Sequence, residues 1–498
     1  MKRNKYILCL GAIFLIAACT DILETVPKSG IVTDASFFKT TADFDAFMYG
    51  IYIDIQGGFG GGSGVDQWIT TTQFISGEMR GPDELRRPVG QTMTASQGKF
   101  LDIWKVYYKI SAKANQILAK LPESKIPDAD KTRLEGEALF FRGFAYYSIA
   151  AAFGNAPLIL EPYKGSQNLM ECTPEAQIWD QVITDFTAAV PKIPTKEVWG
   201  PVNLGRVSKG TVYAYLANAY MWMEDWAKAE TASNSLIALG TYSLMPDVRS
   251  VFSLTNQNNV ESIWEVQYRD IPDGNVTWNG HSAGSPLPEN TAPRNIGNEW
   301  APADGWGENV GSNKLGNSFE PGDDRRAKLL VMVGEKYKGE LMKDTLLIPN
   351  TITQVNSSFS TKYWYGPAPA GVGANYSFGN NVPMFRYAEF LLNYAEILFH
   401  QGKTAQAYDQ INLVRNRALL PDLAESADMA TFMTALMKER RAELNFEVNW
   451  WWHLIRTKTA AKFLLDEYGD VMDPNWYKWP IPQAERDQNP NLCQNPGY

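Results

Sequence analysis

Three glutamates near the C-terminus have a spacing that could serve acid–base chemistry. Glu439, Glu443 and Glu447 recur every four residues, so a helix places their carboxylates on one face. Glycoside hydrolases use two carboxyl groups that flank the substrate about 5–5.5 Å or 6.5–9.5 Å apart. The chain also has nearby basic residues, namely Arg415, Arg417, Arg440, Arg441 and Arg456. Because opposite charges at such spacings pair with one another, we interpret the glutamates as part of an ion-pair network.

Metal and nucleophile chemistry have little support in the sequence. The three histidines, which are His281, His400 and His453, do not have the spacing of metal ligands. The chain contains no G-x-S-x-G elbow and no P-loop. Asp270, Asp273 and Asn275 could hold calcium, although acidic turns are usually only solvated. We therefore predict no catalytic residues, no metal and no cofactor.

Tryptophans in irregular segments are the best candidates for ligand binding. From Ile271 to Gly311, 12 of 41 residues are Gly or Pro, which excludes a long helix. This stretch contains Trp278, Trp300 and Trp306, with Asn279, His281 and Asp304 close by. Flat rings bind the apolar C–H face of a sugar while polar side chains reach its hydroxyls. The same rings could instead cap the core of a loop-rich region.

Other tryptophans have weaker claims to a ligand. Trp364 lies in a second irregular segment, Ser357 to Pro383, and Trp68 precedes another predicted helix. We include both as lesser stacking candidates. A further group follows regular helical patterns and is expected in the core: Trp104, Trp179, Trp222, Trp226 and Trp264.

Helical periodicity dominates the rest of the chain. It predicts helices at 41–55, 100–121, 128–153, 173–190, 208–223, 227–239, 384–401, 404–419, 429–447 and 451–467. For the helix at 173–190 we expect Thr173 as N-cap and Pro174 at the first helical position. Short connections with Gly or Pro indicate antiparallel helix pairs. The Gly-rich stretch 57–64 has no G-x-G-x-x-G register and is interpreted as a loop.

Two of these pairs have tetratricopeptide-type spacing. Leu216, Ala217, Tyr220 and Ala229 occupy its signature positions, where small residues let two helices cross closely. Ala395, Leu398 and Ala407 repeat the offsets in the later pair. Because Ala217 and Ala395 are 178 residues apart, the sequence predicts an interrupted solenoid rather than a regular tandem.

The N-terminus reads as an export signal. Basic residues precede an apolar run from Tyr6 to Ala17, which is too short to span a membrane. Leu15-Ile16-Ala17-Ala18-Cys19 resembles a bacterial lipobox, so Cys19 is the expected site of lipidation; the alternative is an ordinary signal cleaved after an Ala-x-Ala-like site. Removal of Cys9 with the signal and lipidation of Cys19 leave Cys172 and Cys493, which could form one disulfide in an oxidising compartment. The net charge of −9 argues against nucleic acid as a partner.

Several motifs together resemble the SusD/RagB family. They are the Phe140–Tyr147 helix ending at Phe153-Gly154-Asn155-Ala156-Pro157-Leu158, Gly205-Arg206-Val207-Ser208, Arg386-Tyr387-Ala388-Glu389, Val414-Arg415-Asn416-Arg417, Glu439-Arg440-Arg441-Ala442-Glu443-Leu444 and the C-terminal Trp479-Pro480-Ile481-Pro482. The resemblance spans nearly the whole mature chain. It implies a mainly α fold, an α-superhelix of tetratricopeptide-like hairpins with a loop-rich half that binds ligand.

The same resemblance implies an outer-membrane lipoprotein that faces the exterior. Such a protein captures oligosaccharides without catalysis and sits as a lid on a SusC-like TonB-dependent transporter, held to outer-membrane lipid through Cys19. We divide the chain into a signal peptide at 1–18, a tether at 19–40 and one domain at 41–498. Its hairpins lie mainly at 99–240 and 384–467, and its loop-rich excursion is at 245–383.

The sequence departs from the family pattern at two places. Val448, Trp450 and His453 replace the usual Gly, Arg and Asp, so we expect altered packing near the C-terminal helices. The segment Arg86–Gly90 lacks the aromatic residue that many members use for sugar binding. Three other functions stay open: capture of peptides or glycopeptides in the same lid role, an α-helical glycan hydrolase or lyase, and a helical adaptor that binds only protein.

Overall fold

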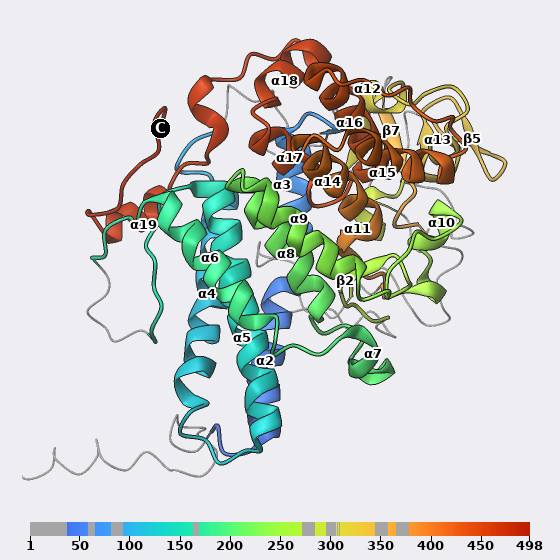
Figure 1. The fold of residues 1–498 in the computed structure, drawn as a ribbon. Coiled ribbons are helices and arrows are strands. Elements are labelled where there is room, and N and C mark those ends of the chain that lie inside the picture. The colour runs from blue at the N-terminus through green and yellow to red at the C-terminus, as the bar shows by residue number, and fades with distance from the viewer. Residues whose placement is uncertain are drawn as a thin grey trace, which may run out of the picture.

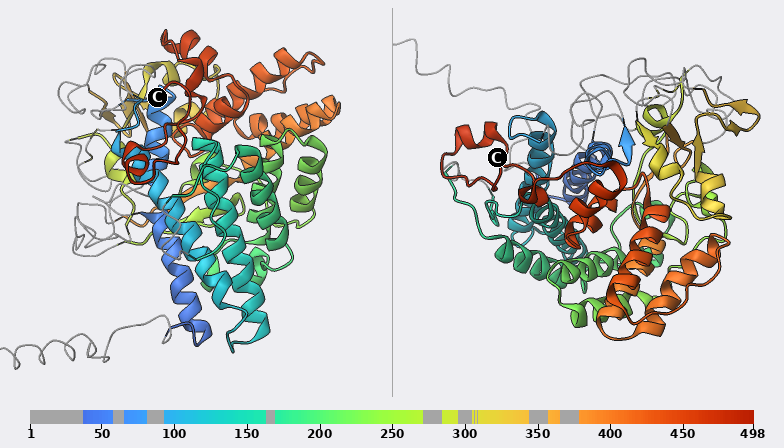
Figure 2. Two further views of the ribbon diagram at one scale, coloured as in Figure 1. Left: turned by 90° about the vertical axis from the view of Figure 1, so that its left-hand side faces the viewer. Right: turned by 90° about the horizontal axis from the view of Figure 1, so that it is seen from above.

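The computed structural model describes residues 37–57, 65–80, 93–162, 169–270, 284–294, 305, 307, 309–343, 357–364 and 378–498. These residues form a mainly helical body with short strands on one side (Figure 1). Seen from above, the helices follow an arc from the teal helices near the C-terminus through the green ones to the orange ones (Figure 2). The predicted fold class, a superhelix of helical hairpins, is confirmed. None of the helices described here is both long and apolar enough to cross a bilayer.

The first part of the arc is built from α2 (Thr41–Gln56), α4 (Gly98–Lys120), α5 (Asp128–Phe153) and α6 (Glu175–Ala189). Helix α5 is buried along most of its length, which explains why its apolar residues surround the helix rather than form a stripe. Gly143 lets α6 approach closely, because a Cβ atom there would lie 2.8 Å from the ring of Phe186.

The N-cap of α6 lies one residue later than predicted, at Pro174 instead of Thr173. Thr173 exchanges backbone hydrogen bonds with Ala156, which holds it in an extended conformation before the helix. The N-cap position falls on Pro174, and the side chain of Asn155 accepts a hydrogen bond from the Glu175 amide at 2.8 Å. A partner from another part of the chain therefore displaces the local capping signal.

The two tetratricopeptide-like hairpins are neighbours in space. The first consists of α8 (Lys209–Trp222) and α9 (Trp226–Ile237), and the second of α14 (Tyr387–His400) and α15 (Thr404–Arg417). Ala229 of α9 is buried in a cluster with Ile397 of α14. The Trp226 and His400 rings stack at 3.8 Å, and the Tyr394 hydroxyl donates to Asn234 at 2.7 Å. The superhelix is thus interrupted in sequence but continuous in space.

The C-terminal helices are shorter than their periodicity predicts. Helix α16 (Met429–Leu444) ends before Glu447, because the Asn445 side chain caps the carbonyls of its last turn and Phe446 adopts a positive φ of 58°. The helix predicted at 451–467 is broken into α17 (Trp450–Arg456) and α18 (Ala460–Tyr468). Between them, the Thr457 hydroxyl bonds to the His453 carbonyl, an interaction that competes with helix continuation.

Within the part of the chain that the structure describes, three small sheets lie beside the helices. One has the order β1 (Met79–Arg80), β3 (Val310–Ser312), β7 (Ser357–Ser360) and β4 (Leu330–Met332). The second pairs β2 (Ser262–Val266) with β8 (Val382–Arg386), and the third pairs β5 (Lys336–Tyr337) with β6 (Glu340–Leu341). The helix predicted from Met384 therefore begins only at Tyr387, since the preceding residues are paired with β2.

The C-terminal tail returns to the start of the arc. A disulfide joins Cys172 to Cys493 across 321 residues of sequence. Next to it, the Asn495 side chain donates to the carbonyls of Phe153 and Trp479 at 2.8 and 2.6 Å. These contacts place the tail beside the end of α5 and the segment before α6, and Figure 1 shows the C-terminus on that side of the molecule, above α19 (Gln483–Gln488).

Candidate functional site

The main ligand candidates lie outside the described residues. These are Trp278, Asn279, His281, Trp300, Asp304 and Trp306. The described residues that flank them show how the loops begin and end. We therefore build the site from the bases of these loops.

The two aromatic segments are joined to each other at their bases. Asp270, which precedes the loop with Trp278, accepts a hydrogen bond from the amide of Gly379 at 2.8 Å through its Oδ1 atom. Ser285, which follows that loop, donates its amide hydrogen to the carbonyl of Phe378 at 2.7 Å. Both ends of the first loop therefore contact the end of the second segment. The described residues on either side of 271–283 therefore lie next to Phe378 and Gly379.

The loop that contains Trp300 is closed at its base in the same way. The Gly307 amide donates to the Ala292 carbonyl at 2.8 Å, and the Asn309 amide donates to the Asn290 carbonyl at 2.9 Å. Gly305 is required for this approach, because a Cβ atom there would lie 2.1 Å from the Ala292 carbonyl oxygen. Trp306 therefore stands in sequence between Gly305 and Gly307, whose backbones both contact Ala292.

A fourth segment, residues 81–92, follows strand β1, which pairs with β3. In β1, Met79 and Arg80 pair with Gly311 and Val310 of β3, directly after the loop with Trp306. Residues 81–92, which include the Arg86–Gly90 stretch without aromatics, therefore begin beside the end of that loop. The described bases lie at two sheets: Asp270 and Gly379 flank the β2–β8 pair, whereas Arg80 and Val310 pair within the β1–β3 ladder.

Trp68 and Trp364 do not fit the predicted stacking role. The Trp68 ring is 5% exposed and packs against Trp452 at 4.9 Å and Trp479 at 5.5 Å. Trp364 is fully buried beside Phe359 and Tyr337. A ring covered by other side chains cannot present an open face to a sugar, so both belong to the core instead.

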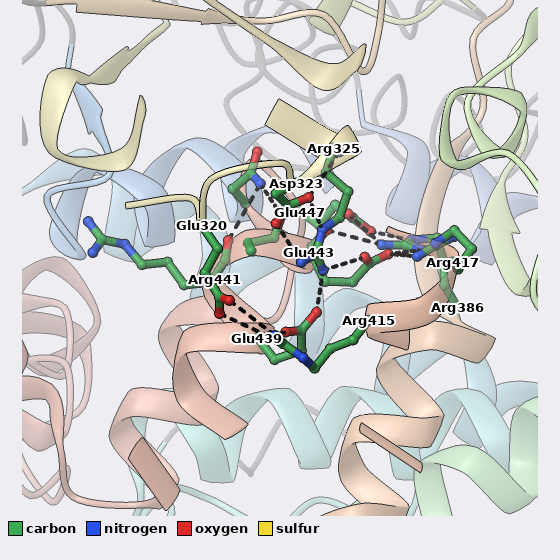
Figure 3. A network of polar contacts seen from close by, with 12 residues as sticks. Glu320, Asp323, Arg325, Arg386, Arg415, Arg417, Glu439, Arg441, Glu443 and Glu447 are labelled. Carbon is green, nitrogen blue, oxygen red and sulfur yellow. Dashed lines mark hydrogen bonds and ion pairs between the residues drawn. The ribbon is translucent and has the colours of Figure 1, made fainter. Parts of the chain in front are cut away.

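The loop bases are supported by a buried ion-pair network centred on α16, shown in Figure 3. Its carboxylates and cations come from widely separated elements, and they are Glu261, Glu320, Asp323, Glu439, Glu443, Glu447, Arg325, Lys362, Arg386, Arg415 and Arg417. We call this group the α16 network. The ion-pair interpretation of the three glutamates is confirmed.

Glu443 lies at the centre of the α16 network. Its carboxylate contacts Arg417 at 2.5 Å, Arg325 at 3.1 Å and Arg386 at 3.1 Å. Burial alone would raise the pKa of Glu443, but the charges of these arginines outweigh it and hold that pKa well below its usual value. The side chain is therefore a permanent anion, and it has no free oxygen to serve as an acid or base.

Lys362 fixes the second aromatic segment to the end of α16. Its buried ammonium donates to the carbonyls of Glu443 and Asn445 at 2.9 and 2.7 Å and pairs with Glu447 at 2.5 Å. The next residue, Tyr363, donates its hydroxyl hydrogen to the Phe446 carbonyl at 3.0 Å. Burial lowers the pKa of Lys362 to about 8.

The first loop and β1 are held by the same helix. Arg386 of β8 pairs with Glu447 at 2.6 Å and with Glu261, which precedes β2. Arg441 contacts Glu78, just before β1, at 2.7 Å. The bases at Asp270, Gly379 and Arg80 are therefore connected, through the strands next to them, to charged residues of α16 or to Glu447, which follows it.

The arginines that we expected in one ion-pair network are divided between two clusters in the structure. Arg415 and Arg417 join the α16 network, whereas Arg440 and Arg456 both pair with Glu396 of α14, at 2.8 and 2.6 Å. Arg325 and Lys362 were not anticipated, because a lone cation in an irregular segment carries no periodic signal. Their burial, at 1% and 0% exposure of the side chain, becomes visible only in the folded chain.

His453, one of the departures from the family pattern, is buried against this second cluster. Its Nδ1 atom contacts Arg440, and its Nε2 atom lies 3.4 Å from Glu389. Burial and the charge of Arg440 lower the pKa of His453 well below its usual value, so the ring is neutral. Burial raises the pKa of Glu389 to about 8. Among the described residues no cluster of potential metal ligands occurs.

Comparisons with known proteins agree with this architecture. Residues 332–498 match the model described as the SusD family, and residues 70–221 match one described as starch-binding and associating with the outer membrane. The SusD-like protein P2 of Formosa agariphila is 26% identical over the full length of both chains.

Solved structures show the same fold. A SusD-like carbohydrate-binding protein from Bacteroides fragilis superposes with a TM-score of 0.77 at 21% identity, covering 92% of this chain and all of the other. Surface glycan-binding protein A from Bacteroides thetaiotaomicron, solved in complex with laminarihexaose, gives 0.75 at 21% identity, with coverage of 92% and 100%.

The fold is that of the SusD-like proteins. The chain belongs to the SusD family. SusD-like glycan-binding proteins are non-catalytic, which confirms the prediction that the protein is not an enzyme.

Proposed function

We propose that the protein is a lipoprotein of the outer-membrane surface that captures oligosaccharides and delivers them to a SusC-like TonB-dependent transporter. Family membership supports a role in binding, and a relative of the same fold was solved with laminarihexaose. The lipobox-like sequence ending at Cys19 supports attachment to the outer membrane.

One observation supports the glycan assignment: the described residues on both sides of the loop with Trp278 bond to those that follow the second aromatic segment, and the α16 network holds the strands next to them. Asp270, Ser285 and Lys362 are the residues that make these connections. A rigid base limits the entropy lost when loops close on a flexible sugar chain. In this proposal Trp278, Trp300 and Trp306 stack on sugar rings, while Asn279, His281 and Asp304 bond to hydroxyls.

A panel of oligosaccharides, titrated while tryptophan fluorescence is followed, tests this assignment. We expect a saturable response to at least one glycan and a loss of at least tenfold in affinity in the Trp278→Ala, Trp300→Ala, Trp306→Ala triple variant. Trp226→Ala is the matched control, because that ring stacks on His400 in the helical half. Equal losses in the control and the triple variant would contradict the assignment.

The same oligosaccharide panel, together with a peptide or glycopeptide, distinguishes two other functions. Retained binding of a peptide or glycopeptide, with no response to any glycan, would assign a different nutrient to the same lid role. Release of reducing ends from the panel would indicate a hydrolase or lyase, whereas capture without catalysis predicts none.

Attachment and delivery have separate tests. Cys19→Ser should move the protein from the membrane fraction to the soluble fraction if the thiol carries lipid. Co-purification of the native protein with a TonB-dependent barrel should succeed after mild detergent extraction. Recovery of the full-length protein without any barrel would contradict the delivery role while leaving glycan binding intact.

A further inference from the structure

A cavity with a volume of about 400 Å³ opens at a place that the sequence did not single out. It lies between the second half of α2, the segment 201–206 before α8, and the end of β2. Its volume is in the range of small-molecule sites, which is about 300–1,000 Å³.

One wall of the cavity is an aromatic and aliphatic surface. Tyr49 is 46% exposed, Ile53 is 40% exposed and Val202 is 92% exposed. The Arg206 guanidinium lies 5.1 Å from the centroid of the Tyr49 ring and donates to its hydroxyl at 3.1 Å. Tyr49 is therefore an exposed ring whose position is fixed from behind, as a stacking platform requires.

The polar part of the lining consists of side-chain amides. Gln267 is held by reciprocal bonds with Asn258 at 2.8 and 3.0 Å, and its backbone carbonyl accepts from Gln56 at 2.7 Å. Asn203 makes one long side-chain bond, to the Trp199 carbonyl at 3.4 Å. Gln56, Asn203 and Asn258 each keep donor and acceptor capacity beyond these bonds. Hydroxyl groups, which both donate and accept, match such amides.

Charge recognition is absent from the described lining. Arg206 is its single ionisable cation, and it is already paired with Glu137 at 2.6 Å and Asp45 at 2.8 Å. Its guanidinium also lies 5.0 Å from the centroid of the Trp199 ring. An anionic ligand would find no uncompensated positive charge here, and a cationic ligand would find no carboxylate in contact with the cavity.

We propose that this cavity is a second carbohydrate site, which binds the end or a short stretch of a neutral oligosaccharide. Tyr49 stacks on the C–H face of one sugar residue, and Asn203, Asn258 and Gln56 bond to its hydroxyls. The choice of a sugar rests on the proposed function, whereas the site itself is argued from Tyr49 and the side-chain amides of its described lining. Two sites on one chain would retain a long glycan while one of them releases it.

Isothermal titration of the full chain with laminarihexaose and with shorter neutral and uronic-acid oligosaccharides tests this proposal. We expect the wild-type protein to show two sites for short neutral sugars. Tyr49→Ala and Asn203→Ala should each weaken the cavity site at least tenfold, and the loop triple variant should retain it. Tyr49→Phe, which keeps the ring, is the control for stacking, and thermal unfolding checks that each variant folds.

The outcomes separate the two proposals. A single site that is lost in the loop variant and unchanged in Tyr49→Ala overturns the cavity proposal and supports the loop site. A single site that is lost in Tyr49→Ala and kept in the loop variant supports the cavity and overturns the loop assignment. Equal binding of uronic-acid sugars in the cavity contradicts its neutral specificity, and no binding of any sugar refutes both.

Discussion

Replacement of Glu443 by Gln should destabilise the protein strongly while keeping the size of the side chain. The carboxylate contacts three guanidinium groups, those of Arg325, Arg386 and Arg417, at 2.5–3.1 Å. A neutral amide removes the negative charge and directs an N–H group toward cations that are at most 4% exposed. Breaking a buried ion pair by removing one partner costs about 3–5 kcal/mol.

Equilibrium unfolding in urea measures this loss directly. A matched control is Asp466→Asn, because the Asp466 pair with Lys462 is exposed, with side chains 52% and 79% accessible. Such a surface pair contributes about 0–1 kcal/mol, and its contribution falls with added salt. Amide exchange should also accelerate in β7 and β8, which Lys362 and Arg386 connect to α16.

Acid titration provides an independent measure. The pKa of Glu443 in the folded protein lies well below the ordinary value of 4.5, so its stabilisation is complete above that pH and is lost as the pH falls through the folded pKa. The Gln variant should therefore lose less stability on acidification than the wild type does. If Glu443→Gln lies within about 0.5 kcal/mol of wild type, the argument that α16 positions the loop bases through buried charge is refuted.

Three further changes have defined outcomes. Glu389→Gln should flatten the pH dependence of stability: with a folded pKa of about 8, Glu389 keeps its proton while the unfolded chain loses it near 4.5, so wild-type stability falls as pH rises between these values. Urea unfolding across this range measures the slope of the unfolding free energy against pH, and equal slopes in the wild type and the variant would contradict this expectation. Reduction of the Cys172–Cys493 disulfide, or the double Ser variant, should cost about 2–5 kcal/mol, because it frees a loop of 321 residues; an unchanged melting temperature would show that the tail is held without it. Gly143→Ala should destabilise by about 1–3 kcal/mol in thermal unfolding, since the new methyl group meets Phe186 at 2.8 Å; a gain in stability would mean that helix propensity outweighs the clash.

The sequence alone determined the local elements and the kind of contact between them. Periodicity located α5 at its observed bounds and most other helices to within a few residues, because an apolar face repeats within one segment. The small residues Ala217 and Ala395 identified both tetratricopeptide-like hairpins. The spacing of Glu439, Glu443 and Glu447 indicated ion pairing, and the structure agrees.

Only the tertiary structure decided which distant residues meet. It placed the two hairpins side by side, joined Cys172 to Cys493, buried Trp68 and selected Lys362 as a partner of Glu447. None of these contacts leaves a periodic trace, since each depends on the path of the long stretch of chain between its partners, from 85 residues for Lys362 and Glu447 to 321 for the disulfide. Where a contact across the chain competed with a local signal, as at Thr173, the distant partner prevailed because the completed fold satisfies more backbone hydrogen bonds.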